Sequence, residues 1–446
     1  MLSRRGFMSL SLLLLTRIQT SQKRVEFLSY DRVAPVLSSN SFSLPRALAG
    51  SGEDIRKAWP SWLQAHDREI RSRIIRGEED TLVNFILFGV SFTNRPRISP
   101  ADPVFVSERI DDFLKAIEVP STDRLKSLQN LLAQLGYDTR QVAQRDRLRR
   151  YLSDSVSRYL AEWRQYQAAA SSKSSASLYK TRGLSTDTDF RPNYAIEQGL
   201  SEVKRRGLLK SVKRVAVIGP GLDFTDKDAG FDYYPLQTLQ PFAVIDSLLR
   251  LDMARSSELR VSVFDISSQT LDHVNQAVIR ARSKQAYTLQ LVLDRTQPWN
   301  AAATSYWRRM GERIGSETAP LPAPPQIQSV DRRAVRIRRE LVALLEPQSL
   351  NIVSQHVEAP AEEKFDLIVA TNIFVYYDRF ELALALLNVE SMLSPTGVML
   401  TNDVLEDYSG IRLRPVGSVS VPYTATQADT VRIYSVPTFR PQLPPG

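Results

Sequence analysis

Two glycines placed directly after an apolar run are the first residues in this sequence that could support chemistry. Gly219 and Gly221 follow residues 215–218, a pattern typical of a buried strand that breaks into a tight loop. Glycine leaves the backbone bare there, so a nucleotide-like ligand can approach closely. A plain turn after a core strand is the alternative, because two glycines alone are a weak signal.

Asp265 is the strongest single candidate for a ligand contact. It ends the apolar run 259–264, which we expect to be the second strand of a parallel sheet. A carboxylate at that point can accept hydrogen bonds from both hydroxyls of a ribose. The alternative is that Asp265 caps a helix beginning near residue 267.

The loop between these two features is acidic, with Asp223, Asp226, Asp228 and Asp232 before a helix that we expect to start near Pro241. Carboxylates repel phosphates, whereas a positively charged ligand tolerates them. The third glycine of the dinucleotide fingerprint is replaced by Phe224. A nicotinamide or flavin cofactor is therefore disfavoured, and a dinucleotide-dependent oxidoreductase ranks third among the interpretations.

The composition excludes several classes of site. The chain of 446 residues has no cysteine, which rules out thiolate metal sites and thiol nucleophiles. Its three histidines, His66, His273 and His356, do not stand at metal-ligand spacings, so we expect no metal site. The net charge of +9 permits contact with nucleic acid, but the Arg-rich segments read as solvated faces and give no specific nucleic-acid signal.

The elements that must position these residues divide the chain into parts. Residues 23–170 show mostly helical periodicity and predict an all-helical N-terminal domain, with amphipathic segments near 55–75, 107–118, 122–135 and 139–168. Residues 171–205 are expected to be a Ser-rich linker followed by an entry helix. From residue 206 to 446, short apolar runs alternate with helical ones, which predicts an α/β domain with a doubly wound, Rossmann-like sheet.

The order of motifs in residues 206–446 resembles the class I S-adenosylmethionine-dependent methyltransferases. The glycine loop follows the first strand and Asp265 ends the second, while Phe-Asp-Leu-Ile at 365–368 begins a later strand and Leu-Ser-Pro-Thr-Gly at 393–397 precedes the fifth. The segment 372–378, Asn-Ile-Phe-Val-Tyr-Tyr-Asp, is locally similar to the chemotaxis-receptor methyltransferases. The resemblance covers about half of the chain.

This resemblance implies roles for single residues. Gly219 and Gly221 would lie against the methionine part of S-adenosylmethionine, Asp265 would hold its ribose, and Asn372 would also bind the cofactor. Tyr376 and Tyr377 would lie near the substrate. No catalytic side chain is assigned, because methyl transfer is a direct displacement that mainly requires alignment.

Three further features bear on the resemblance. The family usually has an acid two residues before the first glycine, where this chain has Val217. An insertion of about 284–346 precedes the third strand, which we place at 350–355, and it is either a lid or substrate wall or a surface excursion. The segment 431–436 fits the family's closing antiparallel strand, paired with 416–423.

Residues 1–22 resemble a twin-arginine export signal, with Arg4 and Arg5 ahead of a short apolar stretch that cannot span a bilayer, so we expect no transmembrane helix. A recognisable cleavage site is missing after it. A frayed or mis-started N-terminus is the alternative. The segment predicts export if it is functional, whereas catalysis with a cytosolic donor predicts a cytoplasmic protein.

The sequence therefore favours an S-adenosylmethionine-dependent methyltransferase whose acceptor, a small molecule or a protein, is not identified. The alternative is a non-catalytic binding or structural protein that retains the fold. Val217 and the export-like N-terminus support that alternative.

Overall fold

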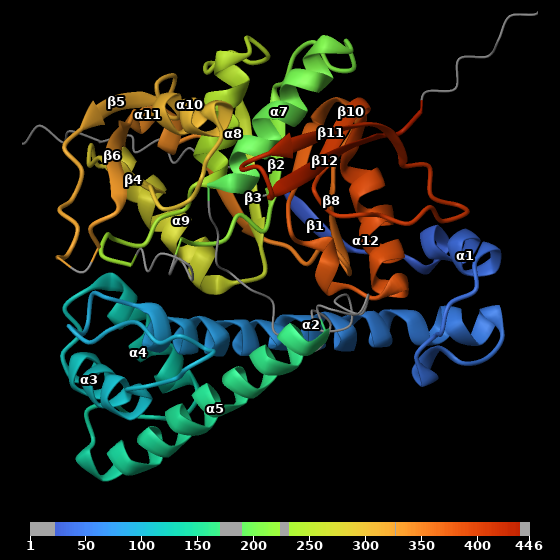
Figure 1. The fold of residues 1–446 in the computed structure, drawn as a ribbon. Helices are drawn as coiled ribbons and strands as arrows, with labels where there is room; N and C mark the ends of the chain where they lie inside the picture. The colour runs from blue at the N-terminus through green and yellow to red at the C-terminus, as the bar shows by residue number, and fades with distance from the viewer. Residues whose placement is uncertain (1–22, 170–189, 224–231, 326, 438–446) are drawn as a thin grey trace, which may run out of the picture.

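The computed structural model describes residues 23–169, 190–223, 232–325 and 327–437 (Figure 1). The proposed signal at 1–22, most of the Ser-rich linker, and Asp226 and Asp228 of the acidic loop lie outside these ranges. Within them, none of the helices combines the length and the apolar character needed to cross a membrane.

A mixed, mostly parallel sheet of seven strands forms the centre of the molecule. The antiparallel strand β12 lies between β10 and β11, as expected for the closing pair. The strands, in spatial order, are β11 (Arg414–Pro422), β12 (Ala428–Ser435), β10 (Leu393–Thr401), β9 (Phe365–Ala370), β2 (Arg214–Ile218), β3 (Arg260–Asp265) and β7 (Leu345–Ser349).

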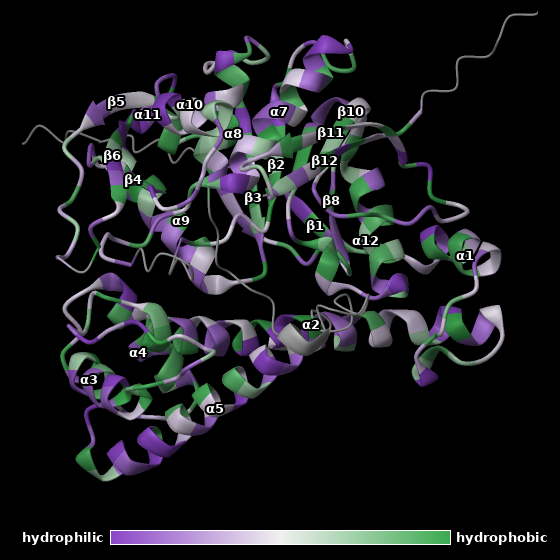
Figure 2. Ribbon diagram, in the orientation of Figure 1, coloured by the Kyte–Doolittle hydropathy of each residue, from purple (hydrophilic) through white to green (hydrophobic). Residues whose placement is uncertain are grey.

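Both faces of the sheet are covered, as a parallel sheet requires. Alternate residues of each strand enter two hydrophobic cores: Val217 packs into one, and Ala216 and Ile218 into the other. Figure 2 shows hydrophobic residues along the central strands and in α12. The first core contains α7 (Arg191–Arg205), α8 (Gln240–Arg250) and α9 (Ser268–Arg282), and the second contains α1 (Tyr30–Ser39), part of α2 (Gly52–Phe88) and α12 (Arg379–Met392).

The expected all-helical N-terminal domain is not confirmed. Its first element is a strand, β1 (Arg24–Phe27), which pairs with β8 (Gln355–Glu358). In addition, α1 and residues 55–74 of α2 share a core with the central sheet. A separate helical core has its buried residues between 82 and 160, in the end of α2 together with α3 (Val106–Glu118), α4 (Asp123–Gln134) and α5 (Arg145–Ala169).

Helix α2 links the two parts of the molecule. A capping box between Ser51 and Asp54 starts it, and it runs for 37 residues, beyond the segment expected near 55–75. Residues 81–90, at the end of α2 and just after it, are all buried. Figure 1 shows α2 passing along one side of the sheet domain, from α1 and α12 towards α3 and α4.

The insertion forms a small antiparallel sheet of its own, in the order β4-β6-β5. Its aromatic residues Tyr306 and Trp307 are buried in the first core. The third strand of the central sheet is β7, so its prediction at 350–355 was wrong by five residues. The insertion contains β4 (Tyr287–Asp294), α10 (Ala301–Arg309), β5 (Gly315–Thr318), β6 (Val330–Ile337) and α11 (Arg339–Val342).

Candidate functional site

A pocket opens at the carboxyl ends of the parallel strands, where β2 has β3 on one side and β9 on the other. Ligands of open α/β sheets bind at such a switch in strand order. The enclosed part of the pocket measures about 60 Å³, and the pocket opens to solvent at its mouth. It is lined by Ile74, Ile218, Gly219, Gly221, Phe264, Asp265, Ile266, Leu350, Ile352, Ile373, Tyr376 and Tyr377.

The two glycines form the floor of this pocket because their backbone turns back sharply after β2. Gly219 has φ 61° and Gly221 φ 65°, in the left-handed region that side chains disfavour. The Gly219 N–H donates to the carbonyl of Phe264, 2.7 Å away, which fixes the loop against β3. A Cβ on Gly219 would push the end of the Ile373 side chain aside, so the positive φ is the main reason for glycine at this position.

Gly219→Ala is expected to abolish ligand binding and to lower the free energy of unfolding by about 1–3 kcal/mol. The strain of a positive φ and the displacement of Ile373 into the pocket both contribute. Gly207→Ala is the matched control, since Gly207 has φ 66° but open space around it. Equal loss of binding in both variants, measured by calorimetry, would contradict a specific role for the loop at Gly219.

Asp265 lies at the pocket with its carboxylate buried. Burial raises its pKa to about 6, although the N–H groups of Ser267, Ile266 and Gly221 lower it by donating to the carboxylate. The alternative role expected for Asp265 was to cap the following helix. The residue that caps α9 is Ser267, whose hydroxyl accepts from Thr270 N–H. Asp265 is therefore held between the glycine loop and α9 without being the cap.

The segment after β9 supplies the opposite wall. Asp403 accepts from the N–H groups of Ile373 and Phe374 at 3.1 and 2.9 Å, which holds the turn that precedes α12. Tyr376 and Tyr377 line the pocket, and their position near a substrate stays a prediction.

Asn372, expected to contact a cofactor, is not among the pocket's lining residues. It adopts φ 57°, and its side-chain oxygen accepts from Asn402, whose own oxygen accepts from the Asn372 N–H, both at 2.8 Å. The reciprocal pair orients the Asn372 side chain towards the end of β10. Asn372 thus stabilises the turn that carries Ile373.

Helix α2 contributes residues that sequence reasoning did not identify. Ile74 lines the pocket, and Glu78 follows one helical turn later on the same face. Burial, together with the negative charge of Asp265, raises the pKa of Glu78 to about 7. The only sequence signal would have been the apolar stripe at 70 and 74, because Glu78 stands in a charged run that resembles a solvated face.

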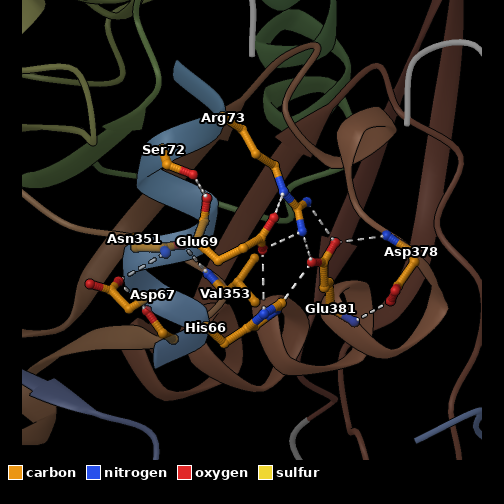
Figure 3. Close-up of polar contacts among 10 residues, drawn as sticks. His66, Asp67, Glu69, Ser72, Arg73, Asn351, Val353, Asp378 and Glu381 are labelled. Atoms are coloured by element: carbon orange, nitrogen blue, oxygen red, sulfur yellow. Dashed lines mark hydrogen bonds and ion pairs between the residues drawn. The ribbon is translucent and has the colours of Figure 1, made fainter. Parts of the chain in front are cut away.

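Polar contacts fix α2 to the sheet domain beside this pocket. Figure 3 shows His66, Glu69 and Arg73 of α2 converging on Glu381 of α12. The Arg73 guanidinium lies 2.6 Å from Glu381 and 2.7 Å from Glu69, and His66 Nε2 lies 3.1 Å from Glu381. Burial opposes the charge of Glu381, but the contacts with His66 and Arg73 lower its pKa to about 2.

The same cluster could in principle attract a cation, because ligand atoms of His66, Glu69 and Glu381 lie within 4.8 Å of one another. Arg73 bridges both carboxylates and neutralises them. The geometry is therefore that of an ion-pair network in which Glu381 is buried and Glu69 is exposed.

A second contact is made by Asp67, the residue after His66 on α2. Asp67 accepts from Asn351 Nδ2 at 2.9 Å and from the Ser354 hydroxyl at 2.6 Å, in the turn that follows β7 (Figure 3 includes Asp67 and Asn351). The turn also carries Leu350 and Ile352 of the pocket wall. Docking of α2 and the shape of the pocket are thereby coupled.

The described acids of the long loop serve as anchors. Asp232 accepts from the N–H groups of Val90 and Ser91 after α2, and Asp223 accepts from Tyr234 and Gln237. Arg124 of α4 donates to the carbonyl of Asp223 at 2.8 Å. These contacts connect the helical part to the loop, so Asp223 and Asp232 have structural partners that the sequence did not reveal.

No model of a protein family and no curated protein matches the chain. Among solved structures, it is similar to the N-methyltransferase NodS from Bradyrhizobium japonicum WM9, at 13% identity over 56% of this chain and 100% of that one, with a TM-score of 0.28. It is also similar to a TehB-like SAM-dependent methyltransferase from Corynebacterium glutamicum, at 11% identity over 63% and 97%, with a TM-score of 0.25. The local similarity to chemotaxis-receptor methyltransferases finds no support in these comparisons. At such identities and TM-scores these likenesses do not support a function. The strand order and the pocket are the observations that bear on it.

Proposed function

We propose that this chain is an S-adenosylmethionine-dependent methyltransferase whose acceptor is not identified. The observation that carries the proposal is the pocket at the switch in strand order, where Gly219, Gly221 and Asp265 meet. Of the described residues that line it, none is positively charged, so it suits a cationic sulfonium better than a phosphate.

The residues of the pocket fit the parts of this cofactor. The bare backbone at Gly219 and Gly221 receives the amino-acid part, and the Asp265 carboxylate accepts from the ribose hydroxyls. Beyond Asp265, Ile266, Leu350 and Ile352 offer apolar contacts to a flat base. When bound, the cofactor supplies an electrophilic methyl group.

The protein's own task in such a reaction is alignment and exclusion of water. Tyr376 and Tyr377 border the space where the acceptor would approach, and α2 covers the pocket through Ile74. We propose that residues 23–170 serve as a cover, that 171–205 connect it, and that 206–446 form the methyltransferase domain. In this proposal Asn372 contributes by holding the turn at Ile373.

The non-catalytic alternative gains little from the structure. Val217, which stands where the resemblance implies an acid, packs into the core on the face of the sheet opposite Ile218. The pocket is open all the same. The export-like segment lies outside the described residues.

Calorimetry on the purified full chain tests the proposal. S-adenosylmethionine and S-adenosylhomocysteine are expected to bind at one site. At a ligand concentration of about 100 times the dissociation constant, the free energy of unfolding should rise by about 2.7 kcal/mol. Failure of both ligands to bind at millimolar concentration would refute the proposal, and binding of NAD or FAD instead would revive the dinucleotide interpretation.

A further inference from the structure

Arg124 is a fully buried arginine in the first turn of α4, and its guanidinium joins two stretches of the loop that follows the pocket glycines. Its Nη1 donates to the carbonyl of Asp223 at 2.8 Å, and its Nε donates to the carbonyl of Tyr234 at 3.0 Å. The guanidinium also lies over the Tyr234 ring, 5.1 Å from the ring centroid. A buried cation is costly unless its donors are used, so these contacts are what allows Arg124 to be buried.

Asp223 is the residue at which the chain leaves the pocket, two positions after Gly221. The loop is fixed at its start because the Gly219 N–H donates to a carbonyl of β3. At its end, the Asp223 N–H donates to the Gln237 carbonyl at 2.8 Å, and the Asp223 carbonyl accepts from Arg124. The glycine loop is therefore held from both sides, and one of the contacts at its far end comes from α4.

The neighbours of Arg124 on α4 make contacts in the same region. Asp123 accepts from the Leu236 N–H at 2.8 Å, and the Ser127 hydroxyl accepts from the side chain of Gln269 in the first turn of α9. Helix α4 therefore contacts both the segment that continues from the glycine loop and the helix that continues from β3.

We propose that Arg124 is a positioning residue of the cofactor pocket: from α4, it holds the chain after Gly221 in the conformation that binds the ligand. The inference rests on the proposed function and deepens it, because it makes the affinity of the pocket depend on the docking of the helical part. None of the described residues that line the pocket belongs to α4, so Arg124 acts through the loop. The forked guanidinium suits this role, since it binds two carbonyls at once, whereas a lysine ammonium is a single point charge.

Titration calorimetry with S-adenosylhomocysteine, run on the full chain, compares Arg124→Lys and Arg124→Met with the wild type. Affinity is expected to fall about tenfold in Arg124→Met, as it would if the loop held its binding conformation about a tenth of the time. Arg124→Lys keeps the charge but not the fork, so its loss should be smaller yet measurable. Thermal melts establish that each variant is folded at the temperature of the titration.

Arg109→Lys and Arg109→Met are the matched controls. Arg109 of α3 is equally buried, and its guanidinium also donates to main-chain carbonyls, those of Ile86, Arg95 and Pro96 in the helical part. Its replacement should lower the melting temperature without lowering the affinity. A purely structural role of Arg124 predicts that the two arginines give the same result.

Hydrogen exchange of the ligand-free protein gives a second readout. The Asp223 amide, which donates to Gln237, is expected to exchange faster in Arg124→Lys than in the wild type, because the loop opens more often when its contact with α4 is weakened. Arg109→Lys should leave the exchange of this amide unchanged.

The outcomes separate the role of Arg124 from the proposed function. If the wild type binds the ligand but the folded Arg124 variants lose no more affinity than the Arg109 controls, the positioning role is wrong and the methyltransferase proposal stands. Unchanged exchange of the Asp223 amide would overturn the positioning role as well. If the wild type binds neither S-adenosylmethionine nor S-adenosylhomocysteine, the proposed function fails, and the exchange of Asp223 still decides whether Arg124 holds the loop.

Discussion

Glu381→Gln is expected to lower the free energy of unfolding by about 3–5 kcal/mol at pH 7, because it removes one partner of a buried ion pair. Glu381 is buried, its oxygens contact His66 and Arg73 of α2, and it accepts from the Asp378 N–H in the capping box that starts α12. The substitution leaves the Arg73 guanidinium with Glu69 alone. Urea denaturation followed by circular dichroism measures the loss.

Glu406→Gln is the matched control. Glu406 forms an ion pair with Arg379 at 2.7 Å, but both side chains are about half exposed. Exposed pairs contribute at most about 1 kcal/mol. A loss in Glu381→Gln no larger than that of the control would show that the cluster does not hold α2 in place.

The pH dependence of the same variant has a defined sign. The pKa of Glu381 falls from an ordinary 4.5 to about 2 on folding, so its charge stabilises the protein fully above about pH 4.5. That contribution is lost as the pH falls from 4.5 towards 2. The difference between the wild type and Glu381→Gln should therefore shrink as the pH falls from about 4.5 to about 2.

Much of the central sheet could be predicted because its strands are buried on both faces. Such strands read as continuous apolar runs, and those at 215–218, 259–264 and 365–370 lie in the structure where the sequence placed them. The residues that end them, Gly219 and Asp265, consequently meet at one edge. Their positions followed from strand order alone.

The misplaced third strand has a physical cause. Strand β7 is the outer strand of the sheet and reads Leu-Glu-Pro-Gln-Ser, with a proline that only an edge position tolerates. The more apolar stretch after it, at 350–354, forms a buried turn that carries part of the pocket wall. Hydrophobicity therefore indicated the wrong segment.

The contribution of α2 to the pocket could not be predicted, because it depends on tertiary docking. Ile74, the α2 residue in the pocket lining, lies more than a hundred residues from Gly219 in the chain. Periodicity shows that Ile70 and Ile74 face a core but not which core they face. The pairing of Asn372 with Asn402 is likewise a tertiary contact that the sequence does not reveal, and its expected contact with a cofactor stays a prediction.

Asp265→Asn is expected to weaken binding of S-adenosylhomocysteine about 100-fold while the protein stays folded. A carboxylate can accept from two hydroxyls, whereas an amide offers one oxygen and a donor that faces the wrong way. Hydrogen bonds to charged groups contribute about 1.5–3 kcal/mol each, and a loss of about 2.8 kcal/mol corresponds to a factor of 100. Calorimetry with the neutral product avoids the separate effect of charge on the sulfonium.

The folded state should tolerate this change because the buried carboxylate is itself unfavourable. The pKa of Asp265 rises from 3.8 to about 6 on folding, so its charge reduces stability above that pH, and an uncharged amide removes this penalty while weakening contacts to Ser267 and Gly221. Asp272→Asn, an exposed substitution on α9, is the matched control and should bind normally. If Asp265→Asn binds as the wild type does while Gly219→Ala does not bind, the ligand uses the glycine loop without Asp265, and the ribose assignment is wrong.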